Sequence, residues 1–377
     1  MRTLRAPIAG PLAGLAALTA ASMAISAPAS AQSADPAFET FVPSANPNKD
    51  GIDYSIWDEA MKGIVISMGP STRETAGSPP PSLGTRVSYG HNSRYRLEGT
   101  RVMFSFLEDD VIASFTEYRR DLEATADLID IQALSRNQQL AYWINLHNVA
   151  LIEQLSNNWP VRQPRELKID GVPMDEAKIL TVEGVALSLR DIRENIVYAN
   201  WNDPMVIYGF WRGEIGGPSL QREAFNGENV PFLLERGATD FVNSLRGTQK
   251  LGSKLQVSEL YAETAEFFFP NFEEDVRAHI AKYANEEVAG ILAKTSRTEA
   301  SVREHDIADL AGGVREPSYA YITSDGQAQG TRIPQSVGAL LAQRQRKFEK
   351  LIREGRTGTV TLTPDTPQEE DTNGEVE

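Results

Sequence analysis

The sequence predicts an α+β fold, with a helix-rich single core domain around a small central sheet that is mostly antiparallel. Several long stretches carry apolar residues at helical spacing, whereas the strand-like segments are short and cluster in the middle of the chain. Of the 377 residues, 41% are hydrophobic and 24% are charged, which is typical of a globular protein with one sizeable core.

Three serines stand where helix N-caps are expected, namely Ser55, Ser135 and Ser188. Gln138 follows Ser135, and Asp191 follows Ser188, at the three-residue spacing of a capping box. These signals and the apolar spacing predict helices over residues 53–65, 107–122, 136–155, 189–199, 230–245, 257–268, 272–293 and 335–353.

Short apolar segments predict strands at residues 167–169, 179–182 and 185–187, with Gly184 in the turn between the last two. Residues 204–211 form a mostly apolar run that also has the length of a strand. Because all these segments are short and lie between helices, the expected sheet is small.

The chain is expected to divide into five parts. Residues 1–31 form a signal peptide, residues 32–50 a flexible segment, and residues 51–315 the core domain. Residues 316–356 form a C-terminal extension that carries a basic amphipathic helix. Residues 357–377 form a disordered tail, because its last thirteen residues contain six acids and no base.

The first 31 residues have the three regions of a secretory signal peptide. Arg2 and Arg5 precede an apolar, alanine-rich stretch, and small residues at Ala29 and Ala31 come before Gln32. The apolar stretch is too short and too interrupted for a spanning helix, so no stable membrane insertion is expected after cleavage. The mature protein is therefore expected to be periplasmic or secreted.

Charge and cysteine content exclude some classes of partner and chemistry. The formal net charge is −15, which makes nucleic acid and anionic lipid surfaces poor partners. The chain contains no cysteine, so its stability in an oxidising compartment must come from the core alone. No local metal-ligand, phosphate-loop or dinucleotide motif is found, and we expect no cofactor and no metal.

The most informative stretch is the apolar helix that carries Trp143, Asn145, His147 and Asn148 together. Amide and imidazole groups on such a helix must find hydrogen-bond partners when they are buried. The stretch, Ala-Tyr-Trp-Ile-Asn-Leu-His-Asn at residues 141–148, resembles the Ala-Phe-Trp-Ile-Asn-Leu-Tyr-Asn signature of the domain-of-unknown-function family 547. Similar motifs follow at residues 185–192 and 203–208, and the resemblance extends roughly over residues 99–269.

The resemblance implies a fold distantly related to papain and transglutaminase, but no activity. In the family pattern, a strand histidine and cysteines in the following loop could form a thiol–imidazole pair. Here the histidine position is Ile207, and the cysteine positions correspond to Arg212 and Gly217. Thiol catalysis is excluded, because it needs a thiolate and the chain has no cysteine.

The candidate catalytic residue is His147, which could act as a general base or could instead be a core histidine with a fixed hydrogen bond. Arg212, in a glycine-rich loop with Glu214, could hold a carboxylate or a phosphate, or it could form a structural ion pair with Glu214 or Asp203. The expected ligand-binding residues are Trp143, Asn145, Asn148, Trp211, Arg212 and Glu214.

Three functions remain open from the sequence. The first is a protein that binds a peptide or a small cell-envelope ligand without a thiol. The second is a hydrolase or transferase with His147 as the base. The third is an interaction scaffold that recruits a protein partner through its basic C-terminal helix, which would show as an exposed apolar patch.

We predict that the mature protein purified from its host begins at Gln32, because signal peptidase requires small residues at the positions of Ala29 and Ala31. N-terminal sequencing or intact mass spectrometry measures this directly. A purified chain that still carries the apolar stretch of residues 12–25 would contradict the expected export.

Overall fold

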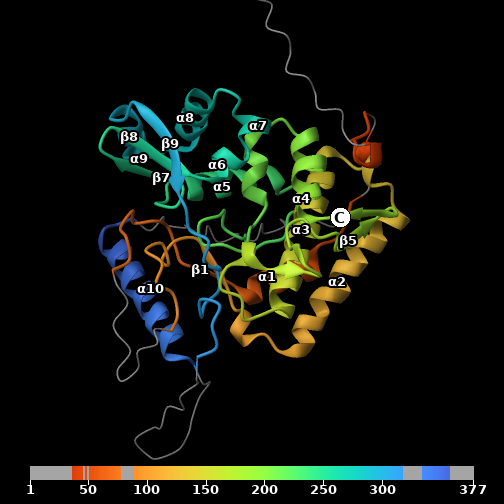
Figure 1. Ribbon diagram of the computed structural model, residues 1–377, viewed down its shortest axis with the longest axis horizontal. Helices are drawn as coiled ribbons and strands as arrows, with labels where there is room; N and C mark the ends of the chain where they lie inside the picture. Colours follow the sequence, from red (N-terminus) through yellow and green to blue (C-terminus); the bar gives the residue numbers. More distant parts are fainter. Residues whose placement is uncertain (1–35, 46, 49–50, 78–88, 317–332, 357–377) are drawn as a thin grey trace, which may run out of the picture. The chain divides into compact units, whose positions relative to one another are not determined.

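The computed structural model describes residues 36–45, 47–48, 51–77, 89–316 and 333–356. It confirms the α+β class, since about 50% of the structure is helical and 12% is strand (Figure 1). The expected signal peptide and acidic tail lie outside the described residues. No helix in the described part has both the length and the apolarity that crossing a bilayer requires.

The helices account for about half of the described residues. The α-helices are α1 (Ser55–Ile64), α2 (Asp109–Leu128), α3 (Arg136–Asn157), α4 (Leu189–Asp191), α5 (Val230–Val242), α6 (Leu260–Glu263), α7 (Ala265–Phe268), α8 (Phe272–Tyr283), α9 (Glu286–Ala293) and α10 (Gln335–Arg353). A π-helix, η5 (Ile192–Tyr198), continues α4, and 3₁₀-helices form η1 (Pro36–Phe41), η2 (Phe104–Phe106), η3 (Ile131–Ala133), η4 (Pro164–Glu166) and η6 (Pro204–Gly209).

The strands form four separate small sheets rather than one central sheet. The antiparallel pairs are β1 (Val65–Ser67) with β2 (Thr100–Val102), β3 (Lys168–Ile169) with β4 (Val172–Pro173), and β5 (Leu180–Val182) with β6 (Val185–Leu187). The fourth sheet has three strands, β7 (Thr248–Leu251), β8 (Lys254–Ser258) and β9 (Arg297–Val302), in which β7–β8 is antiparallel and β8–β9 parallel.

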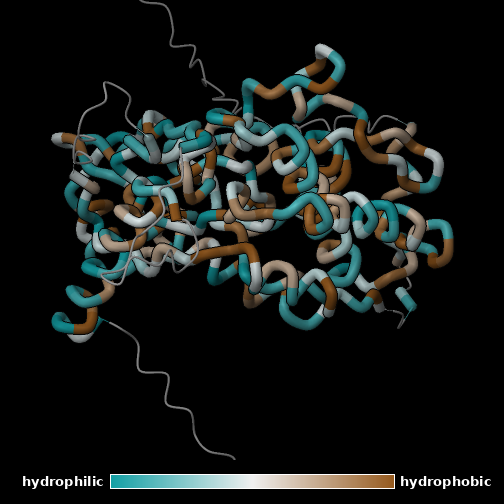
Figure 2. Tube along the Cα trace, turned by 90° about the horizontal axis from the view of Figure 1, so that it is seen from below, coloured by the Kyte–Doolittle hydropathy of each residue, from teal (hydrophilic) through white to brown (hydrophobic). Residues whose placement is uncertain are grey.

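Helix α3 lies at the centre of the core. The Ser135 hydroxyl accepts a hydrogen bond from the Gln138 backbone N–H, which confirms the predicted cap. Almost every residue from Gln139 to Ser156 is buried, because α2 and several loops surround the helix. The Trp143 ring packs edge-on against Phe41 at 5.0 Å. Hydrophobic and polar stretches alternate along the other helices in Figure 2, as expected of helices that bury one face.

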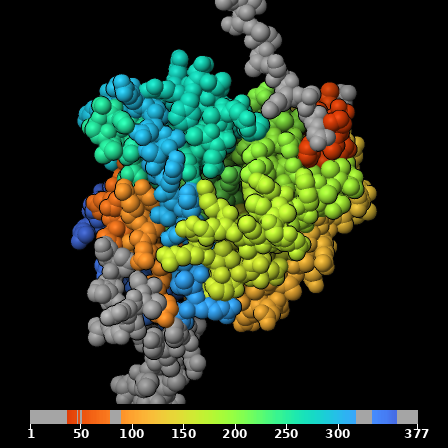
Figure 3. Space-filling model, in the orientation of Figure 1, coloured from red at the N-terminus to blue at the C-terminus, as the bar shows by residue number. Residues whose placement is uncertain are grey.

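The segment after β9 joins distant parts of the core. In Figure 3 it runs down the visible face between residues near 100 and residues near 165. The backbone N–H of Ile307 donates to the Arg162 carbonyl, and that of Ala308 to the Gly213 carbonyl. Val102 makes two backbone hydrogen bonds across this junction: its N–H donates to the Ala308 carbonyl, and its carbonyl accepts the Leu310 N–H. This segment therefore connects three parts of the core that are distant in the sequence, those around Val102, Arg162 and Gly213.

Helix α10 packs against Ile66, Met68, Leu97, Leu310 and Ala311 of the same chain, at one edge of Figure 1. Val337 and Leu340 enter a small apolar cluster with Met68 and Leu310. The expected bounds of the basic helix, residues 335–353, are confirmed. Its apolar face is covered by this chain, so a protein partner would have to engage another face.

Two sequence expectations for the middle of the chain differ from the structure, the first in the type of element and the second in where the helix begins and in its division into two. Residues 204–209 form a 3₁₀-helix rather than a strand, because the Asp203 carboxylate accepts the Met205 N–H and Pro204 occupies the first turn. The expected helix over residues 257–268 begins as strand β8, whose pairing with β7 and β9 outweighs local helical spacing. Only α6 and α7 in this range are helical.

Other boundaries also differ from expectation. The long helix over residues 272–293 is two helices, because Asn285 caps α9 by accepting the Val288 N–H. Ser55 is the first residue of α1 rather than its cap, and its N–H donates to Asp53. Ser188 does form a capping box with Asp191, as predicted.

The expected flexible segment, residues 32–50, is ordered in part. Residues 36–41 form η1, and the side chains of Phe38 and Phe41 are buried in the main core. The prediction rested on the segment's polar and proline-rich composition. Its two phenylalanines form no periodic pattern that would predict a helix or strand, yet both are buried in the core.

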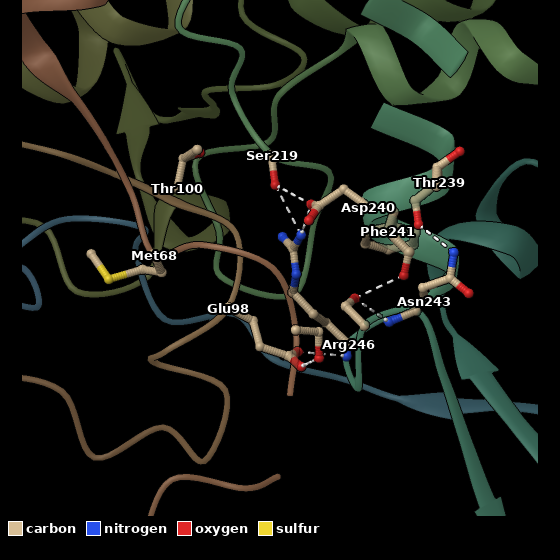
Figure 4. A network of polar contacts seen from close by, with 12 residues as sticks. Met68, Glu98, Thr100, Ser219, Thr239, Asp240, Phe241, Asn243 and Arg246 are labelled. Carbon is tan, nitrogen blue, oxygen red and sulfur yellow. Dashed lines mark hydrogen bonds and ion pairs between the residues drawn. The ribbon is translucent and has the colours of Figure 1, made fainter. Parts of the chain in front are cut away.

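A buried arginine, Arg246, ties α5 to the β1–β2 region (Figure 4). Its guanidinium donates to the Gly217 carbonyl at 2.8 Å, the Ser219 hydroxyl at 2.9 Å and the Asp240 carboxylate at 2.6 Å. Gly99, with φ of +71°, lies against this guanidinium, and a Cβ there would come 2.5 Å from Nη1. Only glycine therefore fits this site.

We predict that Gly99→Ala lowers the free energy of unfolding by roughly 3 kcal/mol or more, because backbone strain adds to disruption of a buried hydrogen-bonded arginine. Gly184→Ala is the matched control: its φ is +77°, but nothing lies within 4 Å of the added Cβ. It should cost only the strain of about 1–2 kcal/mol. Denaturant unfolding of both variants checks this, and equal losses would refute the packing argument.

Candidate functional site

The candidate site is a cavity of about 300 Å³ where α3, the start of η5 and the loop after η6 meet. It brings together His147, Trp211, Arg212 and Glu214, four of the residues that the sequence singled out. The other lining residues are Leu151, Pro164, Arg165, Pro173, Met174, Asp175, Glu176, Leu189, Arg190, Arg193 and Glu263.

His147 forms part of the cavity floor, and its side chain is fully buried. Its Nε2 lies 3.0 Å from Arg193 Nη1, and its Nδ1 lies 3.1 Å from Asn148 Oδ1. Because a guanidinium can only donate, Nε2 must accept, so the proton sits on Nδ1 and points to Asn148. Burial, and then the charge of Arg193, holds the pKa of His147 well below its usual value.

Arg193 is held by a carboxylate on its other side. Its Nη1 and Nη2 donate to the two oxygens of Asp175 at 2.7 and 2.6 Å, in a bidentate pair. Burial alone would raise the pKa of Asp175, but the adjacent guanidinium lowers it further than burial raises it. Asp175, Arg193, His147 and Asn148 therefore form a continuous row of hydrogen bonds, in which the imidazole is neutral.

Asn148 positions the loop on the opposite wall. Its Nδ2 donates to the Gly209 carbonyl at 3.0 Å, and its Oδ1 accepts the Trp211 backbone N–H at 3.1 Å. The Trp211 ring stacks on Phe104, with ring centroids 6.3 Å apart, and forms an apolar wall of the cavity. The amide side chain thus acts as a backbone partner for a segment without regular secondary structure.

The cavity opening is lined by ion pairs, of which Arg212–Glu263 is partly exposed and Arg165–Glu214 has a buried carboxylate. Arg212 Nη2 donates to Glu263 at 2.9 Å, and its side chain is 20% exposed. Arg165 pairs with both oxygens of Glu214 at 2.6 and 2.7 Å. His305 Nδ1 lies 3.5 Å from Glu214, and this carboxylate raises the pKa of His305. The rim therefore mixes both signs of charge within one small opening.

The other predicted ligand-binding residues do not reach this cavity. Trp143 is enclosed in the core between Phe41 and Tyr142. The Asn145 side chain exchanges hydrogen bonds with the backbone of Phe225, at 2.7 and 3.1 Å. Asn148 acts behind the floor, through His147 and Trp211, rather than as a lining residue.

Sequence reasoning missed several residues that shape the site, chiefly Asp175, Arg190, Arg193 and Glu263. Arg190 and Arg193 could have been found, because they lie within the helix start capped by Ser188, whose motif was already recognised. Asp175 and Glu263 lie in segments without any motif, so only folding shows their proximity to α3.

The arrangement leaves His147 without a reactive partner. Its two nitrogens are occupied by Arg193 and Asn148, and no hydroxyl is hydrogen-bonded to it among the described residues. Within the same residues, no group of three histidine, cysteine or acidic side chains is placed to hold a metal ion. The geometry is suited to holding a charged ligand over a rigid floor.

We predict that stability falls as the pH drops from about 7 to about 5, because unfolded histidine takes up a proton near pH 6.5 while buried His147 does not. His91 and His279, with pKa values lowered by burial to about 3 and about 4, act in the same direction. Asp309, whose pKa burial raises to about 6, opposes them in part.

His147→Gln should make this fall shallower, by up to about 1.4 kcal/mol per pH unit, because glutamine can accept from Arg193 but does not titrate. Denaturant unfolding across this pH range measures both chains. Identical pH dependence in the parent and the variant would show that His147 is not the buried neutral group described above.

Comparison with known proteins adds one match. Residues 131–242 match the model of the family described as "Protein of unknown function, DUF547". No curated protein and no solved structure matches the chain. The matched segment contains α3 with His147 and the loop with Arg212 and Glu214, whereas Glu263 lies beyond it. The resemblance to DUF547 that the sequence motifs indicated is confirmed over residues 131–242.

Proposed function

We propose that the protein is exported to the periplasm and binds a peptide or small cell-envelope ligand in the His147 cavity, without thiol chemistry. The observation that carries the proposal is the combination of an apolar wall with charges of both signs around about 300 Å³. Small-molecule sites combine apolar surface with a few convergent polar groups, and this volume is at the lower end of their range. A ligand of two or three residues with both a carboxylate and an ammonium fits that description.

The rim charges differ in how firmly they are bound. Arg193 and Glu214 are buried and hold the floor in place. Arg190 and Glu176 pair at 3.0 Å with side chains 47% and 45% exposed, and Arg212 pairs with the partly exposed Glu263. An exposed pair such as Arg190–Glu176 contributes little stability, so a ligand can replace one partner at small cost, and the partly exposed Glu263 leaves the Arg212 pair within reach of a ligand. A ligand carboxylate would pair with Arg212, and a ligand ammonium with Glu263 or Glu176.

Binding accounts for His147 better than catalysis does. A general base needs a free lone pair within reach of the substrate proton. Here the only unprotonated ring nitrogen accepts from Arg193, and the imidazole is enclosed. A hydrolase or transferase with His147 as the base is therefore the weaker alternative, because Arg193 would first have to move.

We predict that Arg212→Ala weakens the binding of short peptides by about tenfold or more, because it removes a charge-assisted hydrogen bond to the ligand carboxylate. The probes are dipeptides and tripeptides with free termini, compared with the same peptides blocked at both ends. Isothermal titration calorimetry measures the affinity, and the unfolding free energy should change by no more than about 1 kcal/mol.

Arg236→Ala is the matched control. Arg236 also forms a partly exposed ion pair, at 2.8 Å from Glu223, but it lines a different groove of the same domain. The proposal fails if no free peptide binds the parent, or if both variants lose affinity equally. A large loss of stability in Arg212→Ala would instead mark the Arg212–Glu263 pair as structural.

A further inference from the structure

A second cavity, of about 410 Å³, lies between α10 and residues 72–77. Four of its lining side chains are basic, namely Arg96, Arg346, Lys347 and Lys350, and one, Glu74, is acidic. The hydroxyl-bearing residues Thr72 and Thr75 also line it. In a chain with a net charge of −15, this concentration of positive charge is an exception.

Two of the basic groups are buried without a carboxylate partner among the described residues. Lys347 is 7% exposed, and its ammonium donates to the carbonyls of Met68, Gly69 and Leu97 at 3.0, 3.2 and 2.6 Å. Arg96 is 4% exposed and donates to one side-chain amide and two carbonyls, those of Gln343, Ser93 and Gly77. Neutral acceptors satisfy the hydrogen bonds of a cation but leave its charge uncompensated.

The nearby buried acid serves a different purpose. Glu98 accepts the backbone N–H groups of Leu245 and Arg246 at 3.0 and 3.1 Å, and also the Ser71 hydroxyl (Figure 4). No ion pair between Glu98 and either Arg96 or Lys347 is recorded for the described residues. Its charge moderates the field at Lys347, but it does not occupy the cavity.

The two remaining cations stand at the opening. Lys350 pairs with Glu74, whose side chain is 61% exposed, and Arg346 is exposed on the same helix. Helix α10 is held by Lys347, by the apolar contacts of Val337 and Leu340 and by Arg344, which donates to the Ser67 carbonyl, whereas no hydrogen bond or ion pair involves Arg346 among the described residues. The charge of Arg346 is therefore positive charge at the opening that takes no part in holding the helix.

We propose that this cavity is an anion site that takes a phosphoryl group, with Arg96 and Lys347 supplying a buried positive field and Arg346 and Lys350 contacting the phosphate oxygens. A phosphate dianion, with several acceptor oxygens, suits donors that converge from different sides better than a single carboxylate does. The phosphoryl group belongs either to a small soluble phosphate or to a lipid headgroup. The site is separate from the His147 cavity and shares no lining residue with it.

The test is a calorimetric titration of inorganic phosphate into the full chain, its Arg346→Ala/Lys350→Ala variant and an Arg353→Ala control. Arg353 is exposed on the same helix but does not line the cavity. The double variant should bind phosphate at least about tenfold more weakly, and the control should match the parent. Arg212→Ala should also match the parent, so failure of one site is distinguishable from failure of the other.

Flotation with vesicles that contain phosphatidic acid, whose headgroup is a phosphomonoester, against phosphatidylcholine alone, distinguishes the two sources. Binding of inorganic phosphate without flotation identifies a soluble phosphate, and flotation that the double variant loses identifies a headgroup. The proposal is overturned if neither probe binds the parent, or if the control loses as much affinity as the double variant. It is also overturned if sodium chloride at equal ionic strength gives the same heat, since that result is only screening.

Discussion

The structure depends on one constraint, that a helix buried on every side must find a partner for each polar group it carries. Helix α3 meets it at Asn145 and Asn148 by turning their amides outward to backbone that lacks regular structure, whereas Gln139 Oε1, Trp143 Nε1 and Ser156 Oγ have no hydrogen-bond partner among the described residues. Asn145 pairs with both the N–H and the carbonyl of Phe225, while Asn148 bonds Gly209 and Trp211. Each asparagine side chain bonds to the loop backbone as a neighbouring strand would in a sheet. The loops thereby find hydrogen-bond partners although the sheets are only two or three strands wide.

The candidate site follows from that constraint. Asn148, which already bonds to the Trp211 loop, also accepts a hydrogen bond from the Nδ1–H of His147. The other imidazole nitrogen, Nε2, therefore accepts from Arg193. Asp175 then balances the guanidinium. The floor is thus rigid and carries a compensated ion pair, while the rim pairs are partly exposed and can be exchanged. A rigid floor below adaptable charges favours recognition of a polar ligand, and it gives His147 no free lone pair for proton transfer.

Buried cations perform similar work elsewhere in the domain. Arg101 donates to four backbone carbonyls, those of residues 95, 96, 98 and 100, and burial lowers its pKa to about 9. Lys347 fixes α10 through three carbonyls, and burial lowers its pKa to about 8. These side chains hold irregular segments in place by hydrogen bonds, in a chain that has no cysteine and so no disulfide. The carbonyl partners of these cations leave their charge uncompensated, and Lys347 lines the cavity where α10 meets residues 72–77.

The sequence by itself determined the α+β class, the buried polar character of α3, the caps at Ser135 and Ser188 and the lack of a thiol, because these depend on periodicity, local hydrogen bonding or composition. It also indicated that His147, Trp211, Arg212 and Glu214 were notable. Only the tertiary structure decided that Asp175, Arg193 and Glu263 join them, that Trp143 and Asn145 do not, and that residues 204–209 form a 3₁₀-helix. Ion pairs and strand pairings join segments that are far apart in the chain. The local sequence around a side chain shows no pattern that identifies such a distant partner.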